Sequence, residues 1–219
     1  MSALLPLFLD LTDKPCLVIG ADEEARNKTA ALLQAGALPR LLIPPREETW
    51  EAPEGARRLE WPFHPDHLEG CWLVLCAWGD SVFHEFLSAE CRKRNIFLNV
   101  VDRPKFCSVQ WPAVVQVAPV TVAISTRGAS PALASYLKKR LGAALPEELP
   151  ALAAWMSLKR SEVAQRIPDP SRRSRFWKVL LEGGVPDVWL NRGSAAAEEL
   201  LNEYLERELE YSRQPNQTF

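Results

Sequence analysis

The stretch PCLVIGADEEARNKTAALLQAG, residues 15–36, decides the fold of this chain. Its first five residues form a short apolar run that ends at Gly20, which is typical of a buried parallel strand. Residues 23–34 then predict a helix, because acidic side chains occupy the first turn and Gly36 follows the last one. A strand that turns at a glycine into a helix is the opening unit of a doubly wound α/β sheet.

The same alternation continues to about residue 101. A second helix is expected at residues 81–94, ahead of a clear strand at 96–101. Further strands are predicted at residues 39–43 and 71–77 and, more weakly, at 57–61. The order strand, helix, two strands, helix, strand predicts a Rossmann-type doubly wound parallel sheet.

The character of the sequence changes near residue 112. Residues 113–117 and 120–125 are β-branched stretches that predict a small separate sheet. Ser130 and Pro131 then predict a helix start, since serine suits the N-cap and proline the first helical position. Beyond this helix, which runs to about residue 145, only helices are expected. The predicted division is therefore 1–112, 113–146 and 147–219.

Composition limits the classes of function. The 219 residues are 47% hydrophobic and 25% charged, which excludes disorder as the main state. The formal net charge of −2 argues against a nucleic-acid partner. We expect no membrane partner either, because no apolar run approaches roughly 18–20 residues. The opening segment lacks the basic start of a signal peptide, and the five cysteines are expected to be buried free thiols of a cytoplasmic protein.

The turn after the first strand is the position at which such sheets bind a dinucleotide. The usual spacing is G-x-G-x-x-G/A, and Gly20 and Ala25 fit it. Asp22 replaces the middle glycine, and Glu23 and Glu24 make the turn more acidic. The sequence leaves two interpretations open: a pyrophosphate site, or a plain strand-to-helix turn whose acids suit the helix dipole.

Three other places carry possible chemistry. Asp102 follows the strand at 96–101, either as a functional carboxylate or as a turn former. The loop at residues 125–130 combines hydroxyls, an arginine and a helix start, which suits an anion but also simple capping. Arginines at 172–175 could bind carboxylates or form a solvated helix face. His64 and His67 have no third ligand nearby, so no metal site is predicted.

Several segments together resemble one family. They are LPLF at residues 5–8, VIG at 18–20, NVVD at 99–102, VAISTRGASP at 122–131 and RRSRFW at 172–177. In this order and spacing the chain is similar to the precorrin-2 dehydrogenase/sirohydrochlorin ferrochelatase family, the module that also forms the front half of siroheme synthase. The resemblance covers roughly residues 3–180.

The resemblance implies a Rossmann-type NAD-binding domain over residues 1–112, a dimerisation region over 113–146, a helical domain over 147–219 and a homodimer. It implies NAD-dependent oxidation of precorrin-2 to sirohydrochlorin, followed in some members by insertion of Fe(II) as a second substrate. Asp102 falls on the family's aspartate, held to act as general base or to assist metal insertion. The expected cofactor-binding residues are Gly20, Ala21, Asp22, Glu23, Glu24, Pro44 and Pro45. The expected substrate-binding residues are Ser125, Thr126, Arg127, Gly128, Arg173 and Arg175.

The chain departs from the family pattern around the expected NAD pocket. Asp22 stands in the usual glycine run, Trp78 lies after the strand at 71–77, and His84 replaces an asparagine. Pro44 and Pro45 stand where an acid for the ribose is usual, and the sequence does not decide between NAD and NADP. The alternative hypothesis is a sirohydrochlorin chelatase without a cofactor, or a tetrapyrrole carrier or scaffold dimer that has lost NAD binding.

Overall fold

The structure is a computed structural model that describes residues 4–47 and 49–213. It divides the chain into two compact units. The first comprises Met1–Pro112 together with Arg127–Ala129, and the second comprises Ala113–Thr126 together with Ser130–Phe219. Residues 113–146 and 147–219 thus fall almost entirely within one unit, and the division into three domains stays a prediction.

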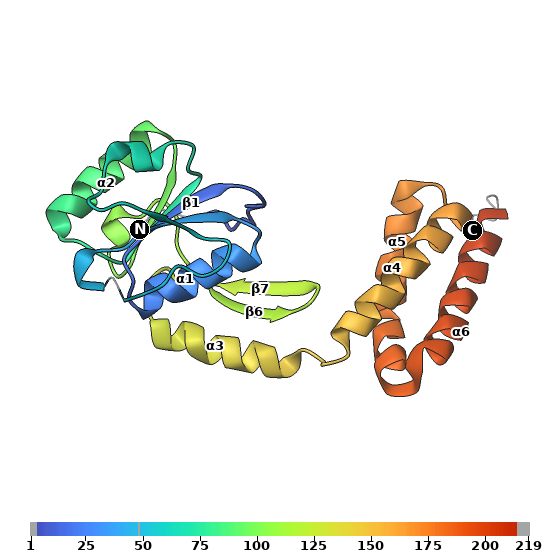
Figure 1. The fold of residues 1–219 in the computed structure, drawn as a ribbon. Helices are drawn as coiled ribbons and strands as arrows, with labels where there is room; N and C mark the ends of the chain where they lie inside the picture. Colours follow the sequence, from blue (N-terminus) through green and yellow to red (C-terminus); the bar gives the residue numbers. More distant parts are fainter. Residues whose placement is uncertain (1–3, 48, 214–219) are drawn as a thin grey trace. The chain divides into compact units, whose positions relative to one another are not determined.

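The first unit is built on a five-stranded sheet (Figure 1). All strand pairs are parallel, and the strand order is β3-β2-β1-β4-β5. The elements are β1 (Pro15–Ile19), α1 (Glu23–Gln34), β2 (Leu38–Leu42), β3 (Arg57–Leu59), β4 (Leu73–Cys76), α2 (Ser81–Lys93) and β5 (Phe97–Val100), with short 3-10 turns η1 (Pro45–Glu47), η2 (Pro65–Leu68) and η3 (Pro104–Phe106). The predicted Rossmann-type doubly wound sheet is confirmed.

Strand β1 is buried on both faces, which explains its continuous apolar run. Leu17 and Ile19 belong to the core cluster that contains Leu87 of α2. Val18 belongs to the other cluster, with Leu32 of α1. Successive side chains of a strand point to opposite faces, so α1 and α2 cover opposite faces of the sheet.

The strand order reverses between β1 and β4, which are neighbours in the sheet. In doubly wound sheets a ligand binds outside the carboxyl ends of the strands at such a point. The residues that follow β1, β2, β4 and β5 all lie at this edge, because the strands are parallel. This edge is where the candidate site must be sought.

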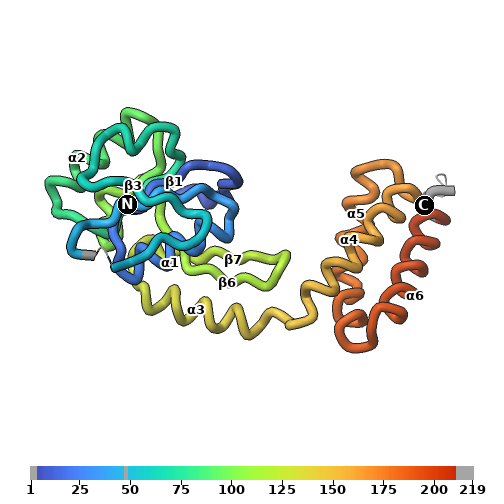
Figure 2. The backbone as a smooth tube through the Cα atoms, in the orientation of Figure 1, coloured from blue at the N-terminus to red at the C-terminus, as the bar shows by residue number. Residues whose placement is uncertain are grey.

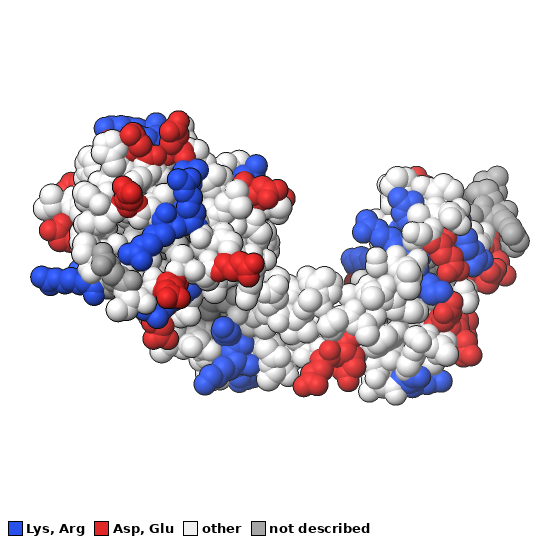
Figure 3. Space-filling model, in the orientation of Figure 1, with Lys and Arg blue, Asp and Glu red and all other residues white. Residues whose placement is uncertain are grey.

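The second unit contains a hairpin and a helix that pack side by side (Figure 2). Strands β6 (Ala113–Val117) and β7 (Val120–Ile124) are antiparallel, and α3 (Pro131–Ala144) packs on them. The predicted start of α3 is confirmed, since the Ser130 hydroxyl accepts a hydrogen bond from the backbone N–H of Leu133 at 3.1 Å. Residues 113–124 carry no charged side chain, and the hairpin is white in Figure 3.

The rest of the second unit is helical, as predicted. It contains α4 (Leu149–Arg166), α5 (Pro170–Glu182) and α6 (Val185–Arg213). Gly193 interrupts α6 with a non-helical φ of +86°. A buried apolar cluster holds the three helices together: Leu152, Trp155, Val163, Phe176, Leu180, Leu201 and Leu205.

No helix in the described part of the chain has both the length and the apolar character needed to cross a membrane. All five cysteines are free thiols, and four of them are buried. On the face drawn in Figure 3, basic and acidic side chains are interspersed, in keeping with the net charge of −2.

Candidate functional site

The turn between β1 and α1 brings the ends of β1 and β4 together. Gly20 adopts φ +119°, and a Cβ built on it would lie 3.3 Å from the Cβ of Ala77, directly after β4. The backbone N–H of Ala77 donates to the carbonyl of Ile19 at 2.8 Å. Glycine is strongly favoured here, because the positive φ and the close approach to Ala77 both penalise a side chain. Gly20 thus matches the first glycine of a dinucleotide-binding loop, the residue that forms the tight turn after the strand.

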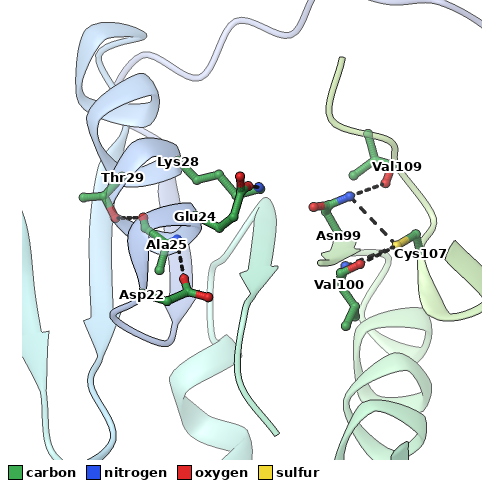
Figure 4. Close-up of polar contacts among 9 residues, drawn as sticks. All are labelled: Asp22, Glu24, Ala25, Lys28, Thr29, Asn99, Val100, Cys107 and Val109. Atoms are coloured by element: carbon green, nitrogen blue, oxygen red, sulfur yellow. Dashed lines mark hydrogen bonds and ion pairs between the residues drawn. The ribbon is translucent and has the colours of Figure 1, made fainter. Parts of the chain in front are cut away.

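Asp22 caps α1 with its own carboxylate. Its Oδ1 accepts a hydrogen bond from the backbone N–H of Ala25 at 2.8 Å (Figure 4). A helix N-terminus is a ready site for an anion, and here a side chain of the protein occupies one of its donors. Asp22 is exposed, so its carboxylate can rotate toward solvent. The backbone of the turn therefore fits a pyrophosphate, while the Asp22 carboxylate competes with it.

The other two acids of the turn differ from each other. Glu24 forms an ion pair with Lys28, one turn along α1 (Figure 4). Lys28 is buried, and its ammonium also lies 5.7 Å from the centre of the Trp111 ring. Glu23 is exposed in the first turn. The charge of Glu24 is thus balanced by Lys28, whereas Asp22 and the exposed Glu23 both repel an anion at this turn.

The four residues directly after β2, Ile43 to Arg46, include no carboxylate for a ribose. Pro44 is buried, and Pro45 is exposed at the start of η1. Neither proline has a polar side-chain atom, so their contribution to a cofactor site is limited to shape and backbone carbonyls.

The segment after β4 is held by an aromatic cluster. The Trp78 ring meets Trp61 edge to face, with centroids 4.6 Å apart, and Phe83 at 5.4 Å. The Trp78 carbonyl accepts a hydrogen bond from the Cys76 thiol at 3.0 Å and lies 3.0 Å from His84 Nε2. His84 therefore fixes the backbone at Trp78, a role that the spacing of the sequence did not reveal.

Asp102 follows β5 at the same edge of the sheet. It is exposed and adopts φ +56°, a left-handed conformation that aspartate tolerates better than most residues. Buried Asn99 of β5 donates from Nδ2 to the carbonyl of Val109 at 3.1 Å (Figure 4). The Cys107 sulfur accepts from the backbone N–H of Val100 at 3.2 Å. These contacts fix residues 107–109 beside β5, and sequence reasoning named Asn99 only within a motif.

The loop between β7 and α3 is shaped by its own hydrogen bonds. The Thr126 hydroxyl donates to the carbonyl of Ser130 at 3.1 Å. Arg127 and Gly128 both have positive φ, +54° and +77°. Arg127–Ala129 belong to the first unit, as Asp102 does, whereas Ser125 and Thr126 belong to the second.

The arginines of α5 already have partners in the protein. Arg173 Nη1 donates to the carbonyls of Ile167 and Pro168 at 3.0 and 3.1 Å. Arg172 and Arg175 both approach Glu208 of α6, at 3.0 and 3.4 Å. These contacts fasten α5 to the end of α4 and to α6. They favour the structural interpretation of the arginine cluster, which belongs to the second unit.

Neither thiol nor metal chemistry is indicated at this edge. Burial raises the pKa of the Cys76 thiol to about 12 and also raises that of Cys107, so both stay protonated. Within residues 4–47 and 49–213, no group of three His, Cys, Asp or Glu side chains is placed to hold a metal ion.

The fold and this edge define a class of protein, an NAD(P)-binding α/β domain followed by a helical region. Residues 7–113 match the family model described as "Putative NAD(P)-binding". Residues 148–205 match the sirohaem synthase dimerisation region. The second match covers α4, α5 and most of α6, whereas the sequence analysis expected dimerisation at residues 113–146.

Similar proteins identify the family. The siroheme synthase of Nitrosospira multiformis is 37% identical over 94% of this chain and 44% of its own length. That of Photorhabdus laumondii is 34% identical over 93% of this chain and 44% of its own. The solved structure of SirC, a precorrin-2 dehydrogenase, aligns with a TM-score of 0.68 and 22% identity, over 93% of this chain and all of SirC. The chain belongs to the family formed by the N-terminal module of siroheme synthase, and it spans less than half the length of these two synthases.

Proposed function

We propose that this protein oxidises precorrin-2 to sirohydrochlorin with NAD in siroheme biosynthesis. The observation that carries the proposal is the carboxyl edge of the sheet, where the glycine turn after β1 and Asp102 after β5 lie on either side of β4. Family membership supports the pathway, and the match of residues 7–113 supports use of an NAD(P) cofactor.

Different residues of the first unit bind the cofactor and accept the proton in this reaction. The glycine turn and the start of α1 would hold the dinucleotide phosphates once the Asp22 carboxylate rotates away. The bound dinucleotide supplies the hydride acceptor. Asp102 accepts the proton that the substrate must lose as its hydride leaves, because an exposed carboxylate at this edge can serve as a general base. Because Gly20 has no Cβ, the β1–α1 turn can lie close to Ala77 at the end of β4.

The substrate carries eight carboxylates, which calls for cationic and hydroxyl partners. We assign this role to Ser125, Thr126, Arg127 and Gly128 of the β7–α3 loop. Arg173 and Arg175 stay secondary candidates, because each would have to share its guanidinium with a protein partner that it already contacts. Fe(II) insertion into sirohydrochlorin is the second step of the proposal. Two pyrrole protons leave as the metal enters, and the exposed Asp102 accepts them one at a time and passes each to solvent.

The assembly proposed is a homodimer in the cytoplasm. The match of α4–α6 to a dimerisation region supports the dimer, and five free thiols suit a reducing compartment.

A spectrophotometric assay with enzymatically generated precorrin-2, with and without NAD, tests the proposal. We expect sirohydrochlorin to appear only when NAD is present, and the Asp102→Asn variant to lose about 100-fold or more in rate. Asp66→Asn is the matched control, since Asp66 is an exposed aspartate of η2 at a distance in sequence from both motifs. Absence of oxidation in the wild-type protein, with a working positive control, refutes the dehydrogenase assignment.

A second candidate function rests on the Asp22 cap. A carboxylate that already accepts a backbone hydrogen bond at the N-terminus of α1 favours a chelatase without a cofactor, or a tetrapyrrole carrier or scaffold dimer. Calorimetric titration of the protein with NAD distinguishes the two. Tight binding excludes this alternative, whereas metal insertion into sirohydrochlorin without any dinucleotide binding supports it.

A further inference from the structure

Lys28 is buried in the second turn of α1, with 6% of its side chain exposed. Its ammonium forms an ion pair with Glu24 (Figure 4) and lies 5.7 Å from the centre of the Trp111 ring. An ammonium has three N–H donors, and within residues 4–47 and 49–213 only Glu24 accepts a hydrogen bond from this one. Lysine is rarely buried without a charged partner, so the burial of this charge depends on a single carboxylate.

The Glu24 carboxylate is not itself buried. Its side chain is 56% exposed in the first turn of α1, so it can rotate into solvent. Rotation alone leaves a buried ammonium unpaired, which is costly. Exchange is different, because a ligand carboxylate that replaces Glu24 keeps the ammonium paired and can use its unused donors. The Lys28 ammonium therefore suits a carboxylate that arrives from solvent.

The segment that leads to Trp111 runs beside β5. The backbone N–H groups of Ser108 and Val109 both donate to the carbonyl of Leu98 in β5, at 2.9 and 3.2 Å. The backbone N–H of Leu98 donates to the Ser108 hydroxyl at 2.8 Å. Trp111 is two residues further along this segment, and its contact with Lys28 places the ammonium on the β5 side of α1.

The other cation of α1 lies on the opposite side of the helix. Arg26 and Lys28 are two positions apart, which is about 200° around a helix. The Arg26 guanidinium lies 5.5 Å from the centre of the Trp50 ring, and Trp50 follows β2 and η1. In the sheet, β2 and β5 lie on opposite sides of β1, and Asp102 follows β5. A substrate that gives its proton to Asp102 thus lies on the same side of α1 as Lys28.

We propose that Lys28 binds a carboxylate of the tetrapyrrole, and that Glu24 pairs with the Lys28 ammonium until the substrate displaces it. The inference rests on the proposed function, because it takes the tetrapyrrole as substrate and Asp102 as the group that it faces. It adds a binding residue on α1 to those of the β7–α3 loop. Glu24 then substitutes for a substrate carboxylate in the free protein and keeps the buried charge paired.

Equilibrium titration with sirohydrochlorin, followed by quenching of tryptophan fluorescence, tests the inference without turnover. Lys28→Met should weaken binding by about 10-fold or more, the range of a charge-assisted hydrogen bond. Glu24→Ala should strengthen binding by about 2- to 5-fold, because it removes the carboxylate that competes with the ligand. An ion pair that only stabilised the fold would change the affinity in the same direction in both variants.

Two further variants assign the effect to the ammonium. Glu24→Ala should give no gain in affinity when it is combined with Lys28→Met, since both act through one pair. Lys28→Arg keeps a cation and should retain more affinity than Lys28→Met. Lys93→Met is the matched control, because Lys93 is an exposed lysine in an ion pair of α2, which covers the other face of the sheet. Thermal unfolding of each variant shows whether the fold is retained.

Kinetics and cofactor titration separate this role from cofactor binding. Lys28→Met should raise KM for precorrin-2 more than it lowers kcat, because it removes a contact that is made before the reaction. Its affinity for NAD, measured by calorimetry, should match that of the wild-type protein. A larger loss of NAD affinity than of sirohydrochlorin affinity overturns the inference.

The direction of the change in each variant decides between the outcomes. Weaker binding by Lys28→Met and tighter binding by Glu24→Ala, with no gain in the double variant, support the inference. Unchanged binding by Lys28→Met, or weaker binding by Glu24→Ala, overturns it and leaves the proposed function in place when the wild-type protein oxidises precorrin-2. If Lys28→Met does not fold, the direction of change in Glu24→Ala still decides. Absence of precorrin-2 oxidation by the wild-type protein refutes the proposed function, whatever the variants show.

Discussion

Replacing Gly20 by alanine tests the central geometric claim about the site. Gly20 has φ +119°, and the added Cβ would lie 3.3 Å from the Ala77 Cβ. Holding alanine in such a conformation costs roughly 1–3 kcal/mol, and the tight contact adds to this cost. For a domain of about 100 residues, each kcal/mol lowers the unfolding midpoint by roughly 4–8 °C. Scanning calorimetry should therefore show a loss of at least several degrees.

Gly70→Ala is the matched control. Gly70 also has positive φ, +68°, but an added Cβ meets nothing within 4 Å. Its substitution measures the backbone strain alone, about 1 kcal/mol. Gly20→Ala should be the more destabilising change, and it should also weaken dinucleotide binding because it forces β1 and β4 apart. Equal midpoints for the two variants, or a Gly20→Ala midpoint equal to that of the wild type, would refute the argument from close approach.

Three further predictions concern stability and reactivity. Ion pairs with Lys93 and Arg94 lower the pKa of Glu90, so its stabilisation is present above the unfolded pKa of about 4.3 and is lost as the pH falls through the folded value. Glu90→Gln should thus lower the midpoint at pH 7, and calorimetry should find that the difference from wild type disappears in acid. Glu208→Gln should lower the free energy of unfolding, measured by urea titration, by roughly 1 kcal/mol, because two arginines approach this largely buried carboxylate. Replacing Glu203, which pairs with Arg207 at the surface, should change the free energy of unfolding by less than about 0.5 kcal/mol. Burial raises the pKa of the Cys91 thiol to about 12, so this thiol should react with a thiol reagent at pH 8 only after urea unfolds the protein. Rapid labelling of Cys91 in the native protein would contradict its burial.

The sheet could be predicted because its strands are buried on both faces. Strand β1 needs apolar side chains on both sides, so burial appears directly as a continuous run in the sequence. Helix starts were equally visible, since Ser130 and the acidic first turn of α1 stand next to or within the helices that they stabilise. The strand expected at residues 57–61 has only three residues, β3, at the edge of the sheet, where Arg57 and Arg58 are exposed.

The partners of charged side chains could not be predicted in the same way. Arg175 lies 33 residues from Glu208, and no local pattern reports a contact over such a distance. The contact between the rings of Trp78 and Trp61, which lie in different loops between strands, could not be predicted either. The position of the Arg26 guanidinium over the Trp50 ring was equally hidden in the sequence. Sequence spacing suggested one cluster of like charge, whereas in the fold Arg172 and Arg175 share Glu208 and Arg173 donates to backbone carbonyls.

The sequence by itself determined the doubly wound sheet, the glycine turn after its first strand, the position of Asp102 and the change to helices, because each depends on residues that are close together along the chain. Only the tertiary structure decided that the arginines of α5 are tied to α4 and α6, and that Arg26 lies between the glycine turn and Trp50. These outcomes depend on side chains whose distances and available partners are set only when separate elements pack together.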